Sequence, residues 1–186
     1  MKQTALHRYD KTDEGDFIID VAASKVEDLY NNFDKSSPYI RRDLDTELGQ
    51  YLFDSVKELR NEPFIIRFTL AEAPGNEKES RVRTSINAYF QYLCSQERQK
   101  LMIMFRKAAI LFFVGLAILF LSVTVYQGLD EDYALLTEVF AHGLTVAAWV
   151  SLWNSFAVVL IEWLPYRRNI NYYERLANAT ISFRMI

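Results

Sequence analysis

The sequence predicts a small α/β (α+β) domain joined to a two-helix transmembrane hairpin, and three observations lead to this fold class. Two long apolar stretches without charged side chains lie at residues 108–126 and 139–161. Apolar and polar residues alternate at 16–22 and 64–70, with the period of a half-buried strand. The same alternation returns after the second apolar stretch, at 180–186.

Each apolar stretch is long enough to cross a lipid bilayer. A helix needs about 20 apolar residues to span a hydrocarbon core that is about 30 Å thick. The second stretch stays uncharged as long as His142 is neutral. We therefore predict a transmembrane hairpin at 106–165, with one span at 108–126 and the other at 139–164.

The charges beside the spans predict the orientation of the hairpin. Arg106 and Lys107 precede the first span, and Arg167 and Arg168 follow the second. The connection between the spans has no Lys or Arg, and its acidic residues are Asp130, Glu131, Asp132 and Glu138. Because basic flanks stay on the cytoplasmic side, we expect a multi-pass protein of the inner (cytoplasmic) membrane with both termini in the cytosol.

Residues 16–105 are expected to form the cytosolic domain, after a mobile polar tail at 1–15. A strand at 16–22 precedes a short helix that Ser24 and Glu27 would cap. Apolar residues at helical spacing predict a second helix over 44–60, and a second strand follows at 64–70. From Glu77 a helix without Pro or Gly runs into the first span as one long juxtamembrane rod.

The segment 166–186 is predicted to return to the cytosolic domain. Pro165 should end the second span, and residues 166–178 can form a helix. The alternating residues that follow predict a strand, with Ile181, Phe183 and Met185 on one face. Since a strand needs partners, we expect it to join the N-terminal sheet, either in its own subunit or in a neighbouring one.

Small residues predict close packing of the two spans. Gly143, Ala147, Ser151 and Ser155 recur every four residues on the second span, and Ala108, Gly115 and Ser122 recur every seven on the first. Small side chains at such spacings let helix backbones approach closely in lipid. A hairpin can bury one of these rows internally, so the second row predicts a homo-oligomer.

Polar residues inside the second span are candidates for a pore or for contacts between helices. Ser151, Asn154, Ser155 and Glu162 fall on one side of the helix at about 100° per residue. An amide such as that of Asn154 is costly to expose to lipid, so it should face protein or water. Two interpretations stay open here: an interhelical hydrogen bond, and a pore-lining amide.

Several arginines could form a binding site for an anion. Arg41 and Arg42 precede the start of a predicted helix, where backbone amides attract negative charge. The other arginines of the predicted domain that could converge on them are Arg67, Arg81, Arg83 and Arg184. The alternative is a solvated surface on which each arginine pairs with one of the many carboxylates.

Nothing in the sequence predicts an enzyme, a bound metal or a cofactor. The catalytic and nucleotide-binding motifs that carry a recognisable spacing are absent. His7, His142 and the single cysteine, Cys94, are too few for a metal site. The net charge of −3 argues against a general nucleic-acid-binding protein.

The segment FIIDVAASKVEDLYNNFDKSSPYIRRDLDTELGQYLFDSVKEL resembles that of bacterial membrane proteins with a compact, RDLD-containing cytosolic domain and two spans. The architecture is also similar to that of two-span channel effectors of nucleotide-signalling antiphage systems such as Hailong. This resemblance covers the architecture and one motif, and it assigns no site residue. It implies a ligand-regulated oligomeric channel in bacterial antiviral defence, with a nucleotide or another anion as its ligand.

Two functions are therefore expected from the sequence. The first is a homo-oligomeric membrane channel or membrane-permeabilising effector that is regulated through its cytosolic domain. The second is a membrane-anchored adaptor or scaffold, whose α/β domain binds a protein partner. The expected partners are the lipid bilayer and further copies of the chain, together with an anionic ligand or a protein at the cytosolic domain.

Overall fold

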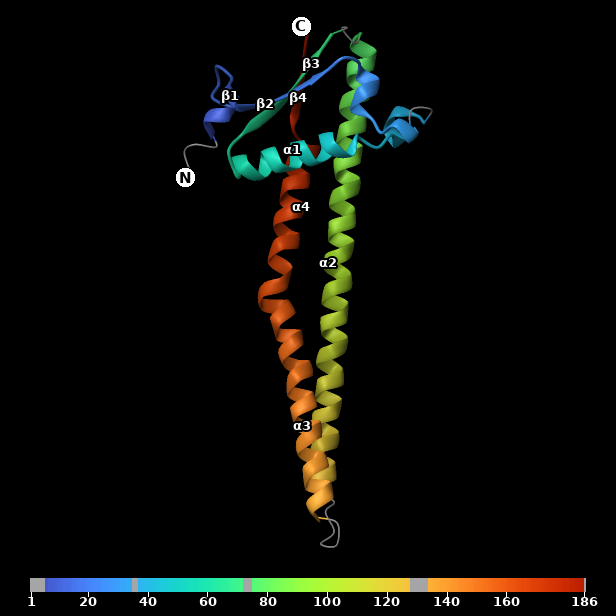
Figure 1. Ribbon diagram of the computed structural model, residues 1–186, viewed down its shortest axis with the longest axis vertical. Helices are drawn as coiled ribbons and strands as arrows, with labels where there is room; N and C mark the ends of the chain where they lie inside the picture. The colour runs from blue at the N-terminus through green and yellow to red at the C-terminus, as the bar shows by residue number, and fades with distance from the viewer. Residues whose placement is uncertain (1–5, 35–36, 72–74, 128–133, 186) are drawn as a thin grey trace. The chain divides into compact units, whose positions relative to one another are not determined.

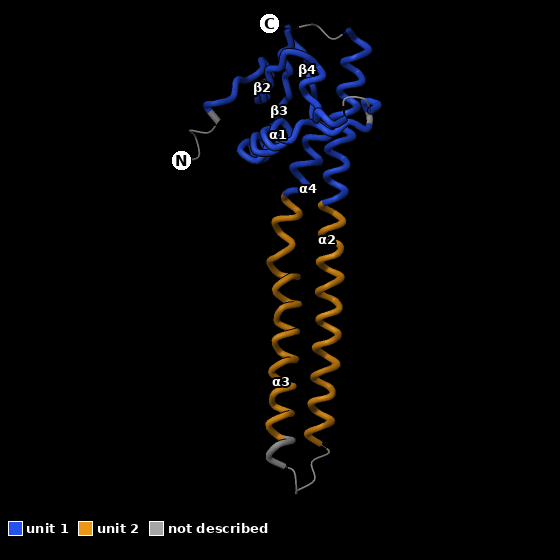
Figure 2. Tube along the Cα trace, turned by 45° about the vertical axis from the view of Figure 1, so that its right-hand side comes forward, with its two compact units in different colours: residues 1–96, 169–186 blue, residues 97–168 orange. Residues whose placement is uncertain are grey.

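A computed structural model describes residues 6–34, 37–71, 75–127 and 134–185 of the chain. The chain divides into two compact units, which Figure 2 shows in different colours. The first unit consists of residues 1–96 and 169–186 and contains the β-sheet. The second, residues 97–168, is helical wherever it is described.

The first unit is built on a mixed sheet of four strands in the order β1-β2-β3-β4 (Figure 1). The strands are β1 (Asp10–Lys11), β2 (Phe17–Ala23), β3 (Phe64–Leu70) and β4 (Thr180–Met185). β2, β3 and β4 run parallel to one another, and β1 is antiparallel to β2. The predicted strands are confirmed, and the C-terminal strand joins the sheet of its own chain.

One face of the sheet carries the hydrophobic core. The register places Ile19 beside Ile66 and Ile66 beside Ile181, so that the apolar residues of three strands form continuous rows. The helices that contribute to this core are α1 (Thr46–Leu59), the first part of α2 (Asn76–Gln127) and the end of α4 (Trp163–Ala177). Their buried core residues are Leu52, Val56, Leu59, Val82, Ile86, Phe90, Leu176 and Ala177.

The predicted helix over 44–60 is confirmed as α1, and its cap explains where it begins. The Asp45 carboxylate accepts hydrogen bonds from the backbone N–H groups of Glu47 (2.9 Å) and Leu48 (3.3 Å). These bonds satisfy amides that have no partner within the first helical turn. The long helix predicted from Glu77 is also confirmed, since α2 runs for 52 residues without a break.

Two predictions for the N-terminal half are wrong. Residues 10–11, assigned to a mobile tail, form β1, because the turn that ends in Gly15 (φ +96°) folds the chain back onto β2. The helix that Ser24 was expected to cap is replaced by the 3-10 helices Val26–Leu29, Asn32–Asp34 and Tyr39–Arg41. Since Val26 and Leu29 are both buried, a tight turn of three-residue period suits this connection better than an α-helix.

Pro165 does not end the second apolar helix, contrary to the prediction. α3 (Ala134–Ala157) continues through a π-helical segment, Val158–Glu162, directly into α4. Proline has no N–H to donate, and its ring displaces the carbonyl four residues earlier, which here belongs to Ile161. The wider π-helical turn lies at that carbonyl, so the chain passes the proline without leaving the helix.

The buried part of β4 should be essential for the stability of the first unit. Ile181 is buried, and the ring of Phe183 stacks on that of Phe68 with centroids 5.8 Å apart. Met185, at the end of this edge strand, is 60% exposed, so the expectation that all three apolar residues are buried is wrong for Met185. Ile181→Ala should lower the free energy of unfolding by about 2–5 kcal/mol. Met185→Ala, the control, should change it by less than about 0.5 kcal/mol. Chemical unfolding of the purified full chain measures both, and equal effects would contradict the role assigned to β4.

Candidate functional site: the exposed face of the apolar helix pair

The second unit contains the apolar parts of α2 and α3, which pack against each other in antiparallel directions. Two helices of the structure, Asn76–Gln127 and Glu138–Ala177, are long and apolar enough to cross a membrane. Within the pair, Phe112 of α2 meets Phe156 of α3, with ring centroids 6.1 Å apart. The buried positions form the contact between the helices, and they are Ala108, Gly115 and Ser122 on α2 and Ala141, Ala148, Leu152 and Ser155 on α3.

The residues of the seven-residue row on the first span, Ala108, Gly115 and Ser122, are all buried. Gly115 allows the closest approach, because a Cβ atom at this position would lie 3.0 Å from Leu152 Cγ and 3.2 Å from the carbonyl oxygen of Ala148. Small residues at every seventh position therefore face α3 along one seam. The predicted packing role of Gly115 and Ser122 follows from this contact.

Hydrogen bonds join the last turns of α2 to the first turns of α3. Ser122 Oγ donates to the carbonyl oxygen of Ala141 at 2.8 Å and lies 2.7 Å from Thr145 Oγ1. Thr145 Oγ1 also donates to the Ala141 carbonyl, at 3.0 Å. Two hydroxyl groups of an otherwise apolar contact are thus satisfied within the pair.

The four-residue row on the second span is divided between two environments. Ser155 is buried against α2, which agrees with the interhelical one of the two roles that the sequence left open. Gly143 and Ala147 are exposed, and a Cβ atom at Gly143 would meet no atom within 4 Å, so neither contributes to the internal contact. Ser151 is half-buried and donates to the Ala147 carbonyl at 3.0 Å.

Asn154 and Glu162 are also exposed on the helix pair. Among the described residues, no side chain or backbone group forms a hydrogen bond with the Asn154 amide. Asn154 lies on the same side of α3 as Gly143 and Ala147, at about 100° per residue. These three residues and the partly exposed Ser151 form a strip of small and polar side chains, which we call the α3 polar strip.

The other exposed side of α3 has a different character. It carries large apolar residues, namely Val146, Trp149, Trp153, Phe156 and Leu160. Glu138 and His142, which lie 3.8 Å apart, are exposed on the same side near the start of the helix. The strip side also carries the exposed Phe140 and Val150, so the two sides differ in their share of small and polar residues. The acidic residues Asp130, Glu131 and Asp132 of the connection lie outside the described residues.

The structure does not bring the six candidate arginines together. Arg81 pairs with Glu77 at 2.5 Å and Arg83 with Glu79 at 4.0 Å, each one helical turn away. Arg42 donates to the carbonyl oxygen of Ser37 at 2.7 Å and stacks over the rings of Tyr30 and Tyr39. Arg41 and Arg184 are exposed at separate places on the first unit.

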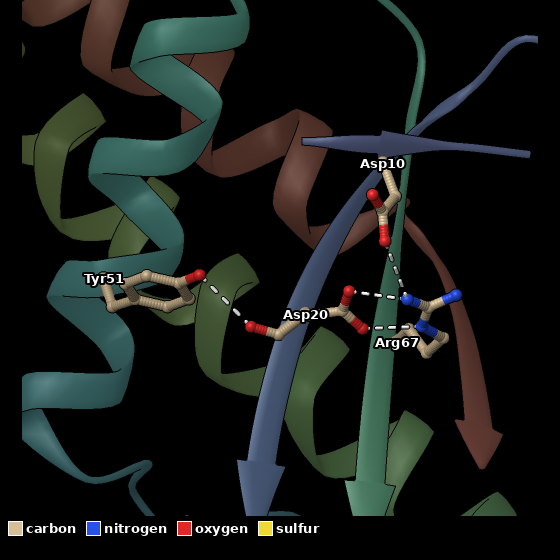
Figure 3. Close-up of polar contacts among 4 residues, drawn as sticks. All are labelled: Asp10, Asp20, Tyr51 and Arg67. Atoms are coloured by element: carbon tan, nitrogen blue, oxygen red, sulfur yellow. Dashed lines mark hydrogen bonds and ion pairs between the residues drawn. The ribbon is translucent and has the colours of Figure 1, made fainter. Parts of the chain in front are cut away.

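Arg67 lies on the polar face of the sheet, where its guanidinium group pairs with Asp20 on the neighbouring strand (Figure 3). Its guanidinium group makes two hydrogen bonds to the Asp20 carboxylate, at 2.5 and 2.6 Å, and Asp10 lies 3.6 Å away. The hydrogen bond to Asp20 is the main reason why the pKa of Arg67 is raised. The six arginines therefore do not converge on one site: Arg67, Arg81 and Arg83 pair with separate carboxylates. Arg42 contacts Ser37 and two tyrosine rings instead.

A pocket that sequence reasoning missed opens on the first unit. It has a volume of about 430 Å³, and it is lined by Arg83, Thr84, Asn87, Ala177, Asn178, Ala179 and Ile181. Asn87 donates to the carbonyl oxygen of Ala177, which joins α2 to the end of α4 at the pocket wall. The sequence points only to Arg83 among them, because the second half of the lining, residues 177–181, lies far from α2 along the chain and shares no motif with it.

No group of His, Cys, Asp and Glu suited to a metal ion occurs among the described residues. No known protein family, curated protein or solved structure matches the chain. The α3 polar strip and the pocket are therefore the features on which a function can be argued.

The two glycines of the helix pair should respond differently to the same substitution. Gly115→Ala should destabilise the pair by about 1–3 kcal/mol, because the added methyl group meets Leu152 and a backbone oxygen. Gly143→Ala should stabilise an isolated pair by up to about 1 kcal/mol, because alanine favours the helix and has free space there. Unfolding in mixed micelles at increasing fractions of denaturing detergent measures both. Equal responses would show that α2 and α3 do not pack through Gly115.

Proposed function

We propose that the chain forms a homo-oligomeric membrane channel or membrane-permeabilising effector, regulated through its cytosolic α/β domain. In this proposal α2 and α3 are the transmembrane hairpin, and the α3 polar strip faces a neighbouring subunit or the pore. The resemblance noted in the sequence supports a place in bacterial antiphage defence.

The exposed amide of Asn154 is the observation that carries the proposal. An unsatisfied polar group in hydrocarbon costs several kcal/mol, and no described residue of the chain satisfies this one. In this proposal its partner is another subunit or water. A ring of such amides from several subunits would supply both.

The division of the exposed surface of α3 supports the same arrangement. Trp149, Trp153 and their large apolar neighbours suit contact with lipid along the middle of the helix, beyond the Glu138 and His142 side chains at its start. Gly143 and Ala147 suit contact with another helix, because small side chains permit close approach in a membrane. One side of the helix can therefore face the bilayer while the other faces the assembly.

Regulation would act on the first unit. The pocket beside Arg83 is polar on one side, which suits an anionic ligand such as a nucleotide, and its wall includes both α2 and the end of α4. These two helices continue into the apolar pair. A ligand bound there would contact both connections between the sheet and the hairpin.

A membrane-anchored adaptor is the second candidate function, and the exposure of Phe33 favours it. This side chain is 95% exposed on the first unit, and exposed aromatic residues are frequent anchors at protein interfaces. In that case the helix pair serves as an anchor, and Asn154 is satisfied by a partner helix without any pore.

The orientation can be tested by labelling introduced cysteines in intact cells. A cysteine at position 130 or 132 should react with a membrane-impermeant thiol reagent from outside, because the connection lacks basic residues. A cysteine at position 2 or 184 should react only after permeabilisation. Reaction of both chain ends from outside would reverse the proposed topology.

Asn154→Leu should abolish ion flux through the channel while leaving the assembly intact. Leucine is close to asparagine in shape but offers no polar group to water or ions, so a hydrated path would dewet. Val146→Leu on the large apolar side is the matched control, and it should conduct like the wild type. Flux from liposomes that contain the purified oligomer measures both.

The same measurement separates the channel from the adaptor. If the assembled wild type conducts nothing with its physiological trigger present, the channel proposal fails. Asn154→Leu would then change only the stability of the helix contact, by about 0.6–2 kcal/mol, as for a lost interhelical hydrogen bond.

A further inference from the structure

Basic side chains are concentrated at one end of the second unit, where α2 enters it and α4 leaves it. Residues 97–107 and 162–168 lie together at this end, because the two long helices are antiparallel (Figure 2). The two segments contain only two acidic side chains, those of Glu97 and Glu162. Their basic residues, which we call the basic collar, are Arg98, Lys100, Arg106, Lys107, Arg167 and Arg168.

Four members of the basic collar form no ion pair with any residue that the structure describes. All four side chains are exposed, and they belong to Arg106, Lys107, Arg167 and Arg168. The Glu97 carboxylate is buried and lies 2.6 Å from Lys100 Nζ, so it neutralises a different member of the collar. Exposed cations without a counter-charge favour an anionic partner from outside the chain.

The collar lies at the depth where lipid headgroups would meet the proposed transmembrane hairpin. From Arg106 to its end at Gln127, α2 is about 32 Å long at 1.5 Å per residue. This length matches a hydrocarbon core about 30 Å thick, so Arg106 and Lys107 reach the edge of that core. Arg98 lies about 12 Å before Arg106 on the same helix. The collar therefore spans the layer that contains the headgroup phosphates.

Apolar side chains are exposed between the two levels of cations. Met102 is 71% exposed on α2, and Ile103 beside it is also exposed. On α4 the Arg167 guanidinium group lies over the ring of Trp163, 5.5 Å from its centroid, and tryptophan is typical of the membrane–water interface. A soluble anion such as inorganic phosphate would make no use of these apolar groups. A phospholipid presents a phosphate and hydrocarbon together, so it matches both parts of the surface.

We propose that the basic collar binds the headgroups of anionic phospholipids in the cytoplasmic leaflet. The inference rests on the transmembrane hairpin of the proposed function, and it holds for a channel and for an adaptor alike. Lysine and arginine side chains beside a membrane attract anionic lipids, and a guanidinium group can donate two hydrogen bonds to one phosphate. Cations at two levels hold the headgroup between them, and the bound lipid thereby fixes the depth of the hairpin.

Trp163 supplies a probe of the lipids at the collar. The chain has three tryptophans, and Trp149→Phe with Trp153→Phe leaves Trp163 as the only one. The full chain with these two changes is reconstituted in bilayers of equal parts phosphatidylglycerol and phosphatidylcholine, with bromine on the acyl chains of one lipid or the other. Bromine quenches indole fluorescence on contact. Brominated phosphatidylglycerol should quench Trp163 at least about twofold more strongly than brominated phosphatidylcholine at low salt, and about 1 M salt should remove the difference.

Two charge variants on this background test whether the collar causes the preference. One carries Arg106→Gln with Lys107→Gln, and the other carries Arg167→Gln with Arg168→Gln. Each removes the unpaired cations of one helix and leaves those of the other. Both should bring the ratio of quenching by the two lipids towards one. The first pair is the more informative, because its residues lie on the helix that does not carry Trp163.

Two further variants are the controls. Arg167→Lys with Arg168→Lys keeps the charge and should keep the preference for the anionic lipid. Lys57→Gln with Lys78→Gln removes two exposed cations of the first unit and should leave the preference unchanged.

The outcomes distinguish this inference from the proposed function. Equal quenching of Trp163 by the two lipids at low salt, or a preference that survives in both charge variants, overturns lipid binding by the collar and leaves the channel proposal standing. Quenching by neither lipid shows that Trp163 does not reach a bilayer, and it overturns both. A preference that is lost in the charge variants and kept in the controls supports the collar.

Discussion

The pairing of β3 with β4 is the interaction on which the rest of the structure depends. Neighbouring parallel strands need a crossover connection, which in most α/β proteins is a single helix. Here the crossover contains the whole helical unit, residues 97–168. Both connections to that unit are held near the sheet, since Asn87 of α2 donates to the carbonyl oxygen of Ala177, and Arg175 of α4 donates to that of Glu62. The helix pair is thus an insertion within one β–α–β unit.

The small residues of the helix pair fall into two groups, one that packs α2 against α3 and one that is exposed on α3. The seam with Gly115 at its centre brings the two backbones together and satisfies Ser122 within the pair. This internal contact uses one side of α3 and leaves Gly143, Ala147 and Asn154 on another. Two helices alone cannot bury both sides of α3. In an environment without water, the amide of Asn154 would therefore need a hydrogen-bond partner from another molecule.

Much of the fold could be predicted from sequence, because alternation and helical spacing are local signals. β3, α1, α2 and β4 follow from such patterns. The turn that adds β1 depends on a partner strand, and the passage of the helix beyond Pro165 depends on a π-helical turn, so neither has a comparable signal. The site was less predictable. The partners of Arg81 and Arg83 lie four residues earlier and are visible in the sequence, whereas the partner of Arg67 follows only from the register of β2 and β3.

The insertion of the helical unit between β3 and β4 also has a consequence for biosynthesis. A ribosome completes the N-terminal strands and both long helices before it makes β4. Until then β3 has a free edge, and the residues of the core that face Ile181 lack their cover. Domains generally fold in the order of synthesis. The sheet of the first unit, however, cannot be completed until both long helices have been synthesised and β4 has reached β3. A chain in which β4 does not reach β3 would therefore keep an open sheet edge, which is prone to pair with another chain.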